Sequence, residues 1–288
     1  MSDTLMEAAR PVSVLRQISA VIRLELKKTF FSRRGWWVYL LAFAPLGLTL
    51  LHTVTMSRLQ VYGRRGHSLS QDTEIFAILF QTYFLHLGIF FGCVGIFSNL
   101  FRTEMLEKTL HYYFLAPIRR EWLVIGKYLS GLLVAAVVFT VSVGLSMYLV
   151  GRHQGDAWGY FFLHGQGLGQ LLRYLMITVL ACIGYGAVFL AAGLLVRNPM
   201  IPAAVVWVWE NLNPFLPGFL KKISVIFYLK GLCPVSLPAG APGPITLLMV
   251  ETDPVSPRLA IVGLLLVSSA VLMYAALAAR RAEISYGE

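Results

Sequence analysis

The sequence predicts an all-α, polytopic membrane protein with six transmembrane helices, an N-terminal amphipathic interfacial helix and a re-entrant outer segment between helices 5 and 6. Composition indicates the class, because 57% of the 288 residues are hydrophobic and 13% are charged, whereas a soluble domain carries about 25% charged residues. Long uncharged runs indicate the helices, because about 20 apolar residues cross a hydrocarbon core as a helix. The alternating pattern of a membrane β-barrel is absent from the sequence.

Six segments are candidates for the membrane-spanning helices. Five of them contain no Asp, Glu, Lys or Arg: Gly35–Ser57, Ile75–Phe101, Tyr128–Gly151, Tyr174–Val196 and Leu259–Ala279. The sixth, Asn198–Leu220, is interrupted by Glu210 and then by Pro214 and Pro217. We interpret its first part as a span and its second part as broken backbone. Six spans place both termini on the same side of the membrane.

The N-terminal region, residues 1–34, is predicted to include an amphipathic helix over 13–34. Apolar residues recur there at spacings of three and four, as on one face of a helix: Leu15, Ile18, Ile22, Leu26 and Phe30. Basic residues occupy the other face: Arg16, Arg23, Lys27 and Arg34. Such a helix suits the inner membrane interface, and the alternative is a soluble helix that packs on a partner. Arg23, Lys27, Trp36 and Trp37 are the predicted interfacial anchors.

The distribution of Lys and Arg indicates the orientation. With both termini inside, the inner segments hold fifteen of these residues and the outer segments hold nine. The positive-inside rule therefore favours a cytoplasmic N-terminus, a transmembrane domain over 35–279 and a cytoplasmic tail over 280–288. We attribute the net charge of +10 to this membrane bias. No basic patch with interleaved aromatic residues indicates nucleic-acid binding.

The outer segment 213–258 combines short apolar stretches with the run PVSLPAGAPGPI, which cannot be helical throughout. Within it, Phe215–Val235 is interpreted as re-entrant or interfacial, because its lysines leave only a short apolar stretch between them. A full crossing by this stretch would make seven spans and would place the C-terminus outside. The lysines of this segment either attract an anionic lipid or substrate or hold a helix at the headgroups.

Glu210 lies about twelve residues into the predicted fifth span, where an ionisable group costs roughly 2.5–3.5 kcal/mol on insertion scales. Two interpretations stay open for it. Glu210 and Asn211 could line a substrate path or gate, or Glu210 could be a buried, hydrogen-bonded structural residue. Asn211, Asn213 and a tryptophan indole are the expected partners of its carboxyl group.

The inner segment 102–121 is the longest excursion between spans on the predicted cytoplasmic side. Residues 102–113 are good helix formers, and Ala116-Pro117 then stops the helix. Arg119 and Arg120 restart the chain toward the next span. The segment is predicted to be a short helix-break-helix unit that could receive a push from a soluble partner.

Two features of this segment resemble the permease subunits of ABC-2 type transporters. The first is the run E-x-x-E-K-T-L, followed by A-P-I-R-R-E-W and G-K-Y-L. The second is the order of elements along the chain. Residues at the matching positions are Glu104, Glu107, Thr109, Leu110, Pro117, Arg119, Arg120 and Lys127. Lys108 stands where this family usually has Gly, which suggests a stiffer helix here.

The resemblance implies a permease that moves a substrate outward across the bacterial inner membrane without an ATP site of its own. The chain has no Walker A motif, because Gly126-Lys127 is followed by Tyr128 and not by Ser or Thr. ATP and Mg²⁺ are therefore expected on two copies of a separate ATPase subunit, and the permease is expected to pair with itself or with a related permease. The implied ATPase-coupling residues are Glu104, Glu107, Lys108, Thr109, Pro117, Arg119 and Arg120. Glu104 and Glu107 could pair with the ATPase or with the loop arginines, or could form a solvated helix face.

Two other classes of function remain as alternatives. A secondary transporter or channel would work without an ATPase, and an intramembrane enzyme would need paired catalytic groups within the spans. His52 and His86 are interpreted as packed residues of apolar spans. No metal site is predicted, because His153 and His164 are eleven residues apart and the three cysteines lack metal-ligand spacing.

Overall fold

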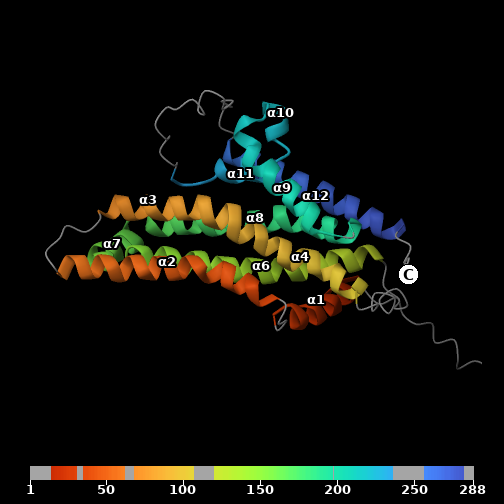
Figure 1. Ribbon diagram of the computed structural model, residues 1–288, viewed down its shortest axis with the longest axis horizontal. Coiled ribbons are helices and arrows are strands. Elements are labelled where there is room, and N and C mark those ends of the chain that lie inside the picture. The colour runs from red at the N-terminus through yellow and green to blue at the C-terminus, as the bar shows by residue number, and fades with distance from the viewer. Residues whose placement is uncertain are drawn as a thin grey trace, which may run out of the picture.

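Long helices running side by side make up most of the molecule in the computed structural model (Figure 1). The structure describes residues 14–30, 35–61, 68–106, 120–196, 198–235 and 256–281. All regular secondary structure within these ranges is helical, so the predicted all-α class is confirmed for them.

Five helices of the described residues are long and apolar enough to cross a membrane. They are α2 (Trp36–Val61), the continuous helix formed by α3 (Leu69–Leu79), η2 (Phe80–Gly88) and α4 (Ile89–Leu106), then α6 (Arg120–Val150), α8 (Gly167–Leu195) and α12 (Pro257–Arg281). They contain the five uncharged runs identified in the sequence. The second of them begins at a capping box, in which Ser68 and Gln71 each bond the backbone N–H of the other, and this fixes the start of α3.

The centre of the bundle is built from α4, α6 and α8. Phe97 of α4 lies between two glycines, since a Cβ atom on Gly131 of α6 or on Gly186 of α8 would come within 3.0 Å of its ring. Gly92 of α4 leaves room in the same way for Phe139 of α6. Small residues let membrane helices approach closely, which strengthens van der Waals packing between them. By contrast, α2 and α12 expose large apolar side chains on the outside of the bundle, as lipid-facing helices do.

The predicted fifth span is shorter in the structure than in the sequence analysis. Helix α9 covers Met200–Leu212, and 13 residues rise only about 20 Å against a hydrocarbon core of roughly 30 Å. It is followed by η4 (Asn213–Phe215), α10 (Gly218–Lys221) and α11 (Val225–Lys230). Pro214 and Pro217 lack the N–H that a continuing helix needs, so the broken backbone predicted after Glu210 is found there. Residues 236–255 of the predicted outer segment lie outside the described residues.

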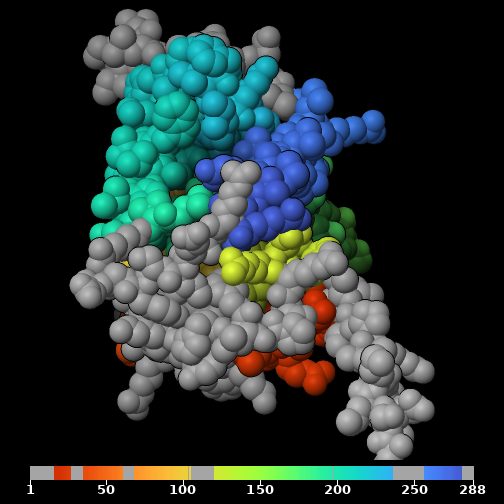
Figure 2. Space-filling view, turned by 90° about the vertical axis from the view of Figure 1, so that its right-hand side faces the viewer, coloured from red at the N-terminus to blue at the C-terminus, as the bar shows by residue number. Residues whose placement is uncertain are grey.

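Helix α1 (Val14–Phe30), the start of α6 and the end of α12 lie together at one end of the bundle, here called the α1 end (Figure 1). Figure 2 views this end and shows the start of α6 between α12 and α1. The opposite end holds the start of α3, the short helix η3 (Arg152–Gln154) and α7 (Asp156–His164), and it is called the α7 end. The amphipathic helix predicted over 13–34 is confirmed as a helix over 14–30, where it packs against the bundle, and residues 13 and 31–34 lie outside the described residues. Its position at a membrane interface stays a prediction.

Candidate functional site

A buried lysine joins three elements at the α1 end. The Lys127 side chain is 0% exposed, and its Nζ lies 2.6 Å from Glu25 Oε1 and 2.9 Å from Glu104 Oε1. The same ammonium donates a hydrogen bond of 2.9 Å to the carbonyl of Leu100. Glu25 belongs to α1, Glu104 and Leu100 belong to α4, and Lys127 belongs to α6. We call Glu25, Glu104 and Lys127 the charge cluster.

Local packing explains why α1 reaches this lysine. Val21 of α1 is buried against Gly126 of α6, where an added Cβ would come within 2.9 Å of the valine side chain. Glu25 lies one helical turn after Val21, on the same side of α1. The glycine that precedes Lys127 therefore lets α1 come close enough for Glu25 to reach the ammonium.

The buried charges of the cluster hold α1, α4 and α6 together. Each of these side chains is at least 96% buried, and an ion removed from water loses several kcal/mol of solvation. Two carboxylates, a carbonyl and the Phe101 ring, whose centroid lies 5.3 Å from Nζ, surround the ammonium and offset this cost. A buried pair that loses one partner is strongly destabilised, so the three helices are expected to move together at this point.

A second contact joins the start of α6 to the end of α12. Arg280 pairs with Glu121, and Arg120 donates from Nη1 to the carbonyl of Arg280 at 3.4 Å. This contact is partly exposed, so its own contribution to stability is small. Its importance is positional, because it brings the last helix to the α1 end.

The structure places two of the predicted coupling residues at this end. Glu104 is in the charge cluster and is 3% exposed, so it is not part of a solvated helix face. Arg120 begins α6 beside α12. The other predicted coupling residues lie outside the described residues: Glu107, Lys108, Thr109, Pro117 and Arg119.

The predicted interfacial anchors lie at the same end. Trp36 and Trp37 begin α2 with exposed fractions of 67% and 43%, which suits side chains at a membrane surface. The ring of Trp37 also fills the space left by Gly95 of α4. Arg23 is exposed on α1, whereas the side chain of Lys27 lies outside what the structure describes.

Glu210 has local partners that differ from those expected. Its carboxylate accepts hydrogen bonds from the Ser224 hydroxyl at 2.6 Å and from the backbone N–H groups of Val225 and Ile226 at 3.0 and 2.9 Å. The side chain thus caps the N-terminus of α11, where a negative charge is favourable. Asn211 is exposed and donates to the carbonyl of Trp207 at 2.7 Å. These contacts support the structural interpretation of Glu210, and they do not test a role in a substrate path.

Sequence reasoning missed Glu25, the third member of the charge cluster. Glu25 is 102 residues from its partner Lys127, so no local spacing connects them. One signal was present: Glu25 is the only acidic residue in α1 (VLRQISAVIRLELKKTF), and an acidic residue on an otherwise basic helix indicates a specific basic partner.

The fold and the charge cluster together define a multi-pass helical membrane protein whose helices are tied to an amphipathic helix at one end. A protein-family model described as ABC-2 family transporter protein matches residues 21–210. The chain belongs to this family, whose members supply the membrane domain of an ABC-type permease. The matched region includes all three members of the charge cluster. No curated protein matches the sequence.

Proposed function

We propose that this chain is the membrane half of an ABC-2 exporter, driven by ATP that a separate ATPase subunit hydrolyses. Two ATPase copies would dock at the α1 end, which then faces the cytoplasm, and ATP and Mg²⁺ would bind to them. The permease would work as a pair, as a homodimer or with a related permease, in the bacterial inner membrane. Membership of the ABC-2 family supports the ATPase partner. The orientation, the pairing and the location in the inner membrane rest on the sequence features given above.

The charge cluster carries this proposal. A docked ATPase must move transmembrane helices, so its contact surface must be tied to them. Glu104 lies near the end of α4, inside the predicted coupling segment 102–121, and Lys127 lies in α6 just after this segment. Because Lys127 holds Glu104 and Glu25 at the same point, a displacement of the coupling segment or of α1 would be passed to α4 and α6 together.

The positions of α8 and α12 support the proposed six membrane crossings. Gly193, near the end of α8, packs against Ser98 in the half of α4 nearer the α1 end, and Arg280 at the end of α12 contacts Glu121 there. Two successive long helices that both end at the α1 end require the chain between them to return across the bilayer. We assign this fifth crossing to α9 and the short helices that follow it.

The segment after α9 is proposed to be the re-entrant segment. Val225 of α11 packs against Gly184, near the middle of α8, so Glu210 and α11 lie at mid-depth. Farther on, the carbonyl of Val235 accepts a hydrogen bond of 2.9 Å from Gln81 of η2, in the half of that helix nearer the α7 end. Irregular backbone at this depth is tolerated where it is packed against protein, as it is here. Glu210 and Asn211 remain proposed residues of a substrate path.

Reconstitution with the ATPase tests the proposed function. The permease is co-expressed with a candidate ABC ATPase from the same organism, the complex is purified through a tag on the permease, and ATP turnover is measured in lipid nanodiscs. We expect co-purification and a turnover that differs from that of the ATPase alone. The reversal pair Glu104→Lys/Glu107→Lys is expected to abolish this difference, since it places positive charge beside Lys127.

The control for charge reversal is the pair Arg58→Glu/Arg258→Glu, which changes as many charges at exposed positions far from the α1 end. This control should purify with the ATPase and stimulate it as the wild type does. A permease that neither binds the ATPase nor alters its turnover would overturn the proposed function.

A further inference from the structure

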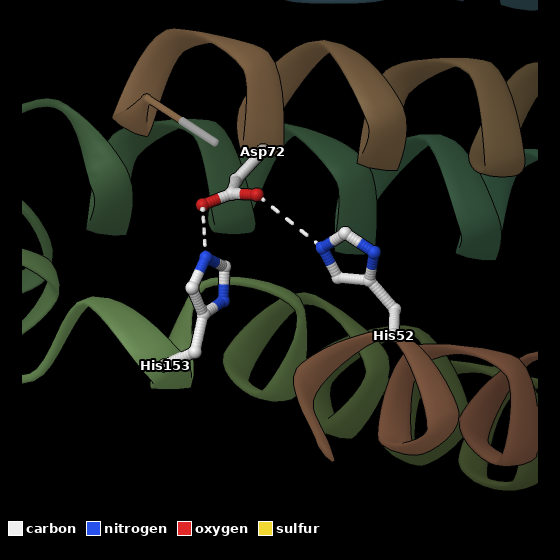
Figure 3. Close-up of side chains that lie close together, drawn as sticks. All are labelled: His52, Asp72 and His153. Carbon is white, nitrogen blue, oxygen red and sulfur yellow. Dashed lines mark hydrogen bonds and ion pairs between the residues drawn. The ribbon is translucent and has the colours of Figure 1, made fainter. Parts of the chain in front are cut away.

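Three potential metal ligands converge near the α7 end, away from the charge cluster. Figure 3 shows His52, Asp72 and His153 pointing toward one another from α2, α3 and η3. One ligand atom of each residue lies within 4.8 Å of those of the other two. The side chains of Asp72 and His153 are 0% exposed and that of His52 is 16% exposed.

The three side chains surround one point at which a metal ion could bind, since their ligand atoms all lie within 4.8 Å of one another. His52 Nε2 lies 3.3 Å from Asp72 Oδ1, and His153 Nε2 lies 3.4 Å from Asp72 Oδ2. The first of these contacts is a long hydrogen bond, because a charge-assisted N–H···O bond measures about 2.7–2.9 Å. Two ligands of one tetrahedral Zn²⁺, with bonds of about 2.0–2.1 Å, are separated by roughly 3.3 Å. The two rings lie at 80° to each other, so neither ring stacks on the other.

We propose that His52, Asp72 and His153 form a binding site for a divalent transition-metal ion, with Zn²⁺ as the expected ion. Two imidazoles and one carboxylate make a donor set that zinc sites use, with a fourth position for water. Burial supports this assignment, because a buried carboxylate is normally paired or coordinates a metal. The ion would tie together two spans and the link after α6, so it would brace the α7 end of the bundle.

Gln154 provides an outer hydrogen bond to the proposed site. Its Nε2 donates to Asp72 Oδ2 at 2.7 Å, which orients the carboxylate toward the two histidines. Such outer partners tune metal affinity, and their loss typically weakens binding about 10- to 100-fold. Gln154 is therefore a positioning residue that does not bind the ion itself. Its substitution should weaken metal binding in part, whereas loss of a ligand should abolish it.

Metal binding to the purified permease tests the proposal. The protein is purified in detergent through a histidine-free tag, stripped with a chelator and titrated with Co²⁺, whose visible absorption reports tetrahedral coordination. We expect one Co²⁺ per chain, displaced by Zn²⁺, with Zn²⁺ also raising the thermal unfolding temperature. Asp72→Asn and His153→Ala are expected to lose both signals, and Gln154→Ala to bind about 10- to 100-fold more weakly.

His164→Ala on α7 is the matched control, because this histidine is exposed at the same end of the molecule. It should bind Co²⁺ as the wild type does. His52 is partly exposed, so His52→Ala supplies the ligand test if His153→Ala does not fold. The proposal is overturned if the wild type shows no tetrahedral Co²⁺ spectrum, or if Asp72→Asn and His52→Ala bind Co²⁺ as tightly as the wild type.

Discussion

At the residue scale, Lys127 shows how one buried charge organises several helices. Its ammonium contacts the carboxylates of Glu25 and Glu104 and the carbonyl of Leu100. A lysine in a membrane protein normally reaches for water at the interface, but this one is fully buried. Lys127 can therefore stay buried because its partners compensate its charge. Without Lys127, the two carboxylates would be buried without a positive partner.

Replacing Lys127 by Met should destabilise the permease by about 3–5 kcal/mol, because it leaves two buried carboxylates without their shared ammonium. Denaturant unfolding in detergent micelles measures this loss. Lys222→Met is the control, since the Lys222 side chain is exposed. The variant that combines Lys127→Met with Glu25→Gln and Glu104→Gln should recover part of the stability. Equal unfolding of Lys127→Met and Lys222→Met would show that the cluster does not hold the helices.

Replacing Glu210 by Leu should loosen α11, because the N–H groups of Val225 and Ile226 lose their acceptor in a buried place. Each unsatisfied buried donor costs about 1–3 kcal/mol. Limited proteolysis at 213–235, followed by mass spectrometry, should show faster cleavage than in the wild type. Asn211→Leu is the neighbouring control, because its side chain bonds only within α9 among the described contacts. Unchanged cleavage of Glu210→Leu would remove the capping role.

At the element scale, the long helices could be predicted from the sequence, because each contains a long run of uncharged residues. The five uncharged runs are long enough to cross the hydrocarbon core, and each lies within a helix of that length. The amphipathic pattern before Trp36 was also sufficient to predict α1. These signals depend on neighbouring residues in the sequence, so no knowledge of the fold was needed.

Contacts between elements could not be predicted from local patterns. Glu25 meets Lys127 across 102 positions, and His52, Asp72 and His153 come from three elements that only the folded chain brings together. The sequence indicated His52 as a packed residue, and the spacing of His153 gave no metal signal. The break after Leu212 was predictable, because Pro214 and Pro217 end the helix there, but the short helices that follow it could not be placed from the sequence.

Helix α1 packs against α6 at Gly126. This glycine has no side chain and therefore leaves room for Val21 of α1. Gly126→Leu should force α1 away, because an added Cβ lies 2.9 Å from the valine side chain. Overpacking costs about 1–3 kcal/mol. The same decrease in the free energy of local opening corresponds to roughly 5- to 150-fold faster hydrogen exchange in α1. Hydrogen–deuterium exchange with mass spectrometry measures this rate. Gly144→Leu on the same helix is the control, since no atom lies within 4 Å of its Cβ position. Equal exchange in both variants would contradict this packing.

At the scale of the whole molecule, the two ends of the bundle have different proposed roles. The α1 end gathers the amphipathic helix, the charge cluster and the contact between α6 and α12. The α7 end gathers the proposed metal ligands and two exposed apolar side chains of α7, Tyr160 and Leu163, which are 69% and 78% exposed. The proposed exporter would use this asymmetry, because the proposed ATPase would act at the α1 end and the substrate would leave at the other.

The sidedness of segment 102–121 tests the central claim most directly. The cysteines Cys93, Cys182 and Cys233 are replaced by Ala, and Tyr112→Cys or, as the control, Tyr160→Cys is introduced. A membrane-impermeant maleimide is then added to spheroplasts or to inside-out vesicles. We predict that Cys at position 112 is labelled only in inside-out vesicles and less so when the ATPase is bound, whereas Cys at position 160 is labelled only in spheroplasts. Labelling at position 112 in spheroplasts would contradict the account.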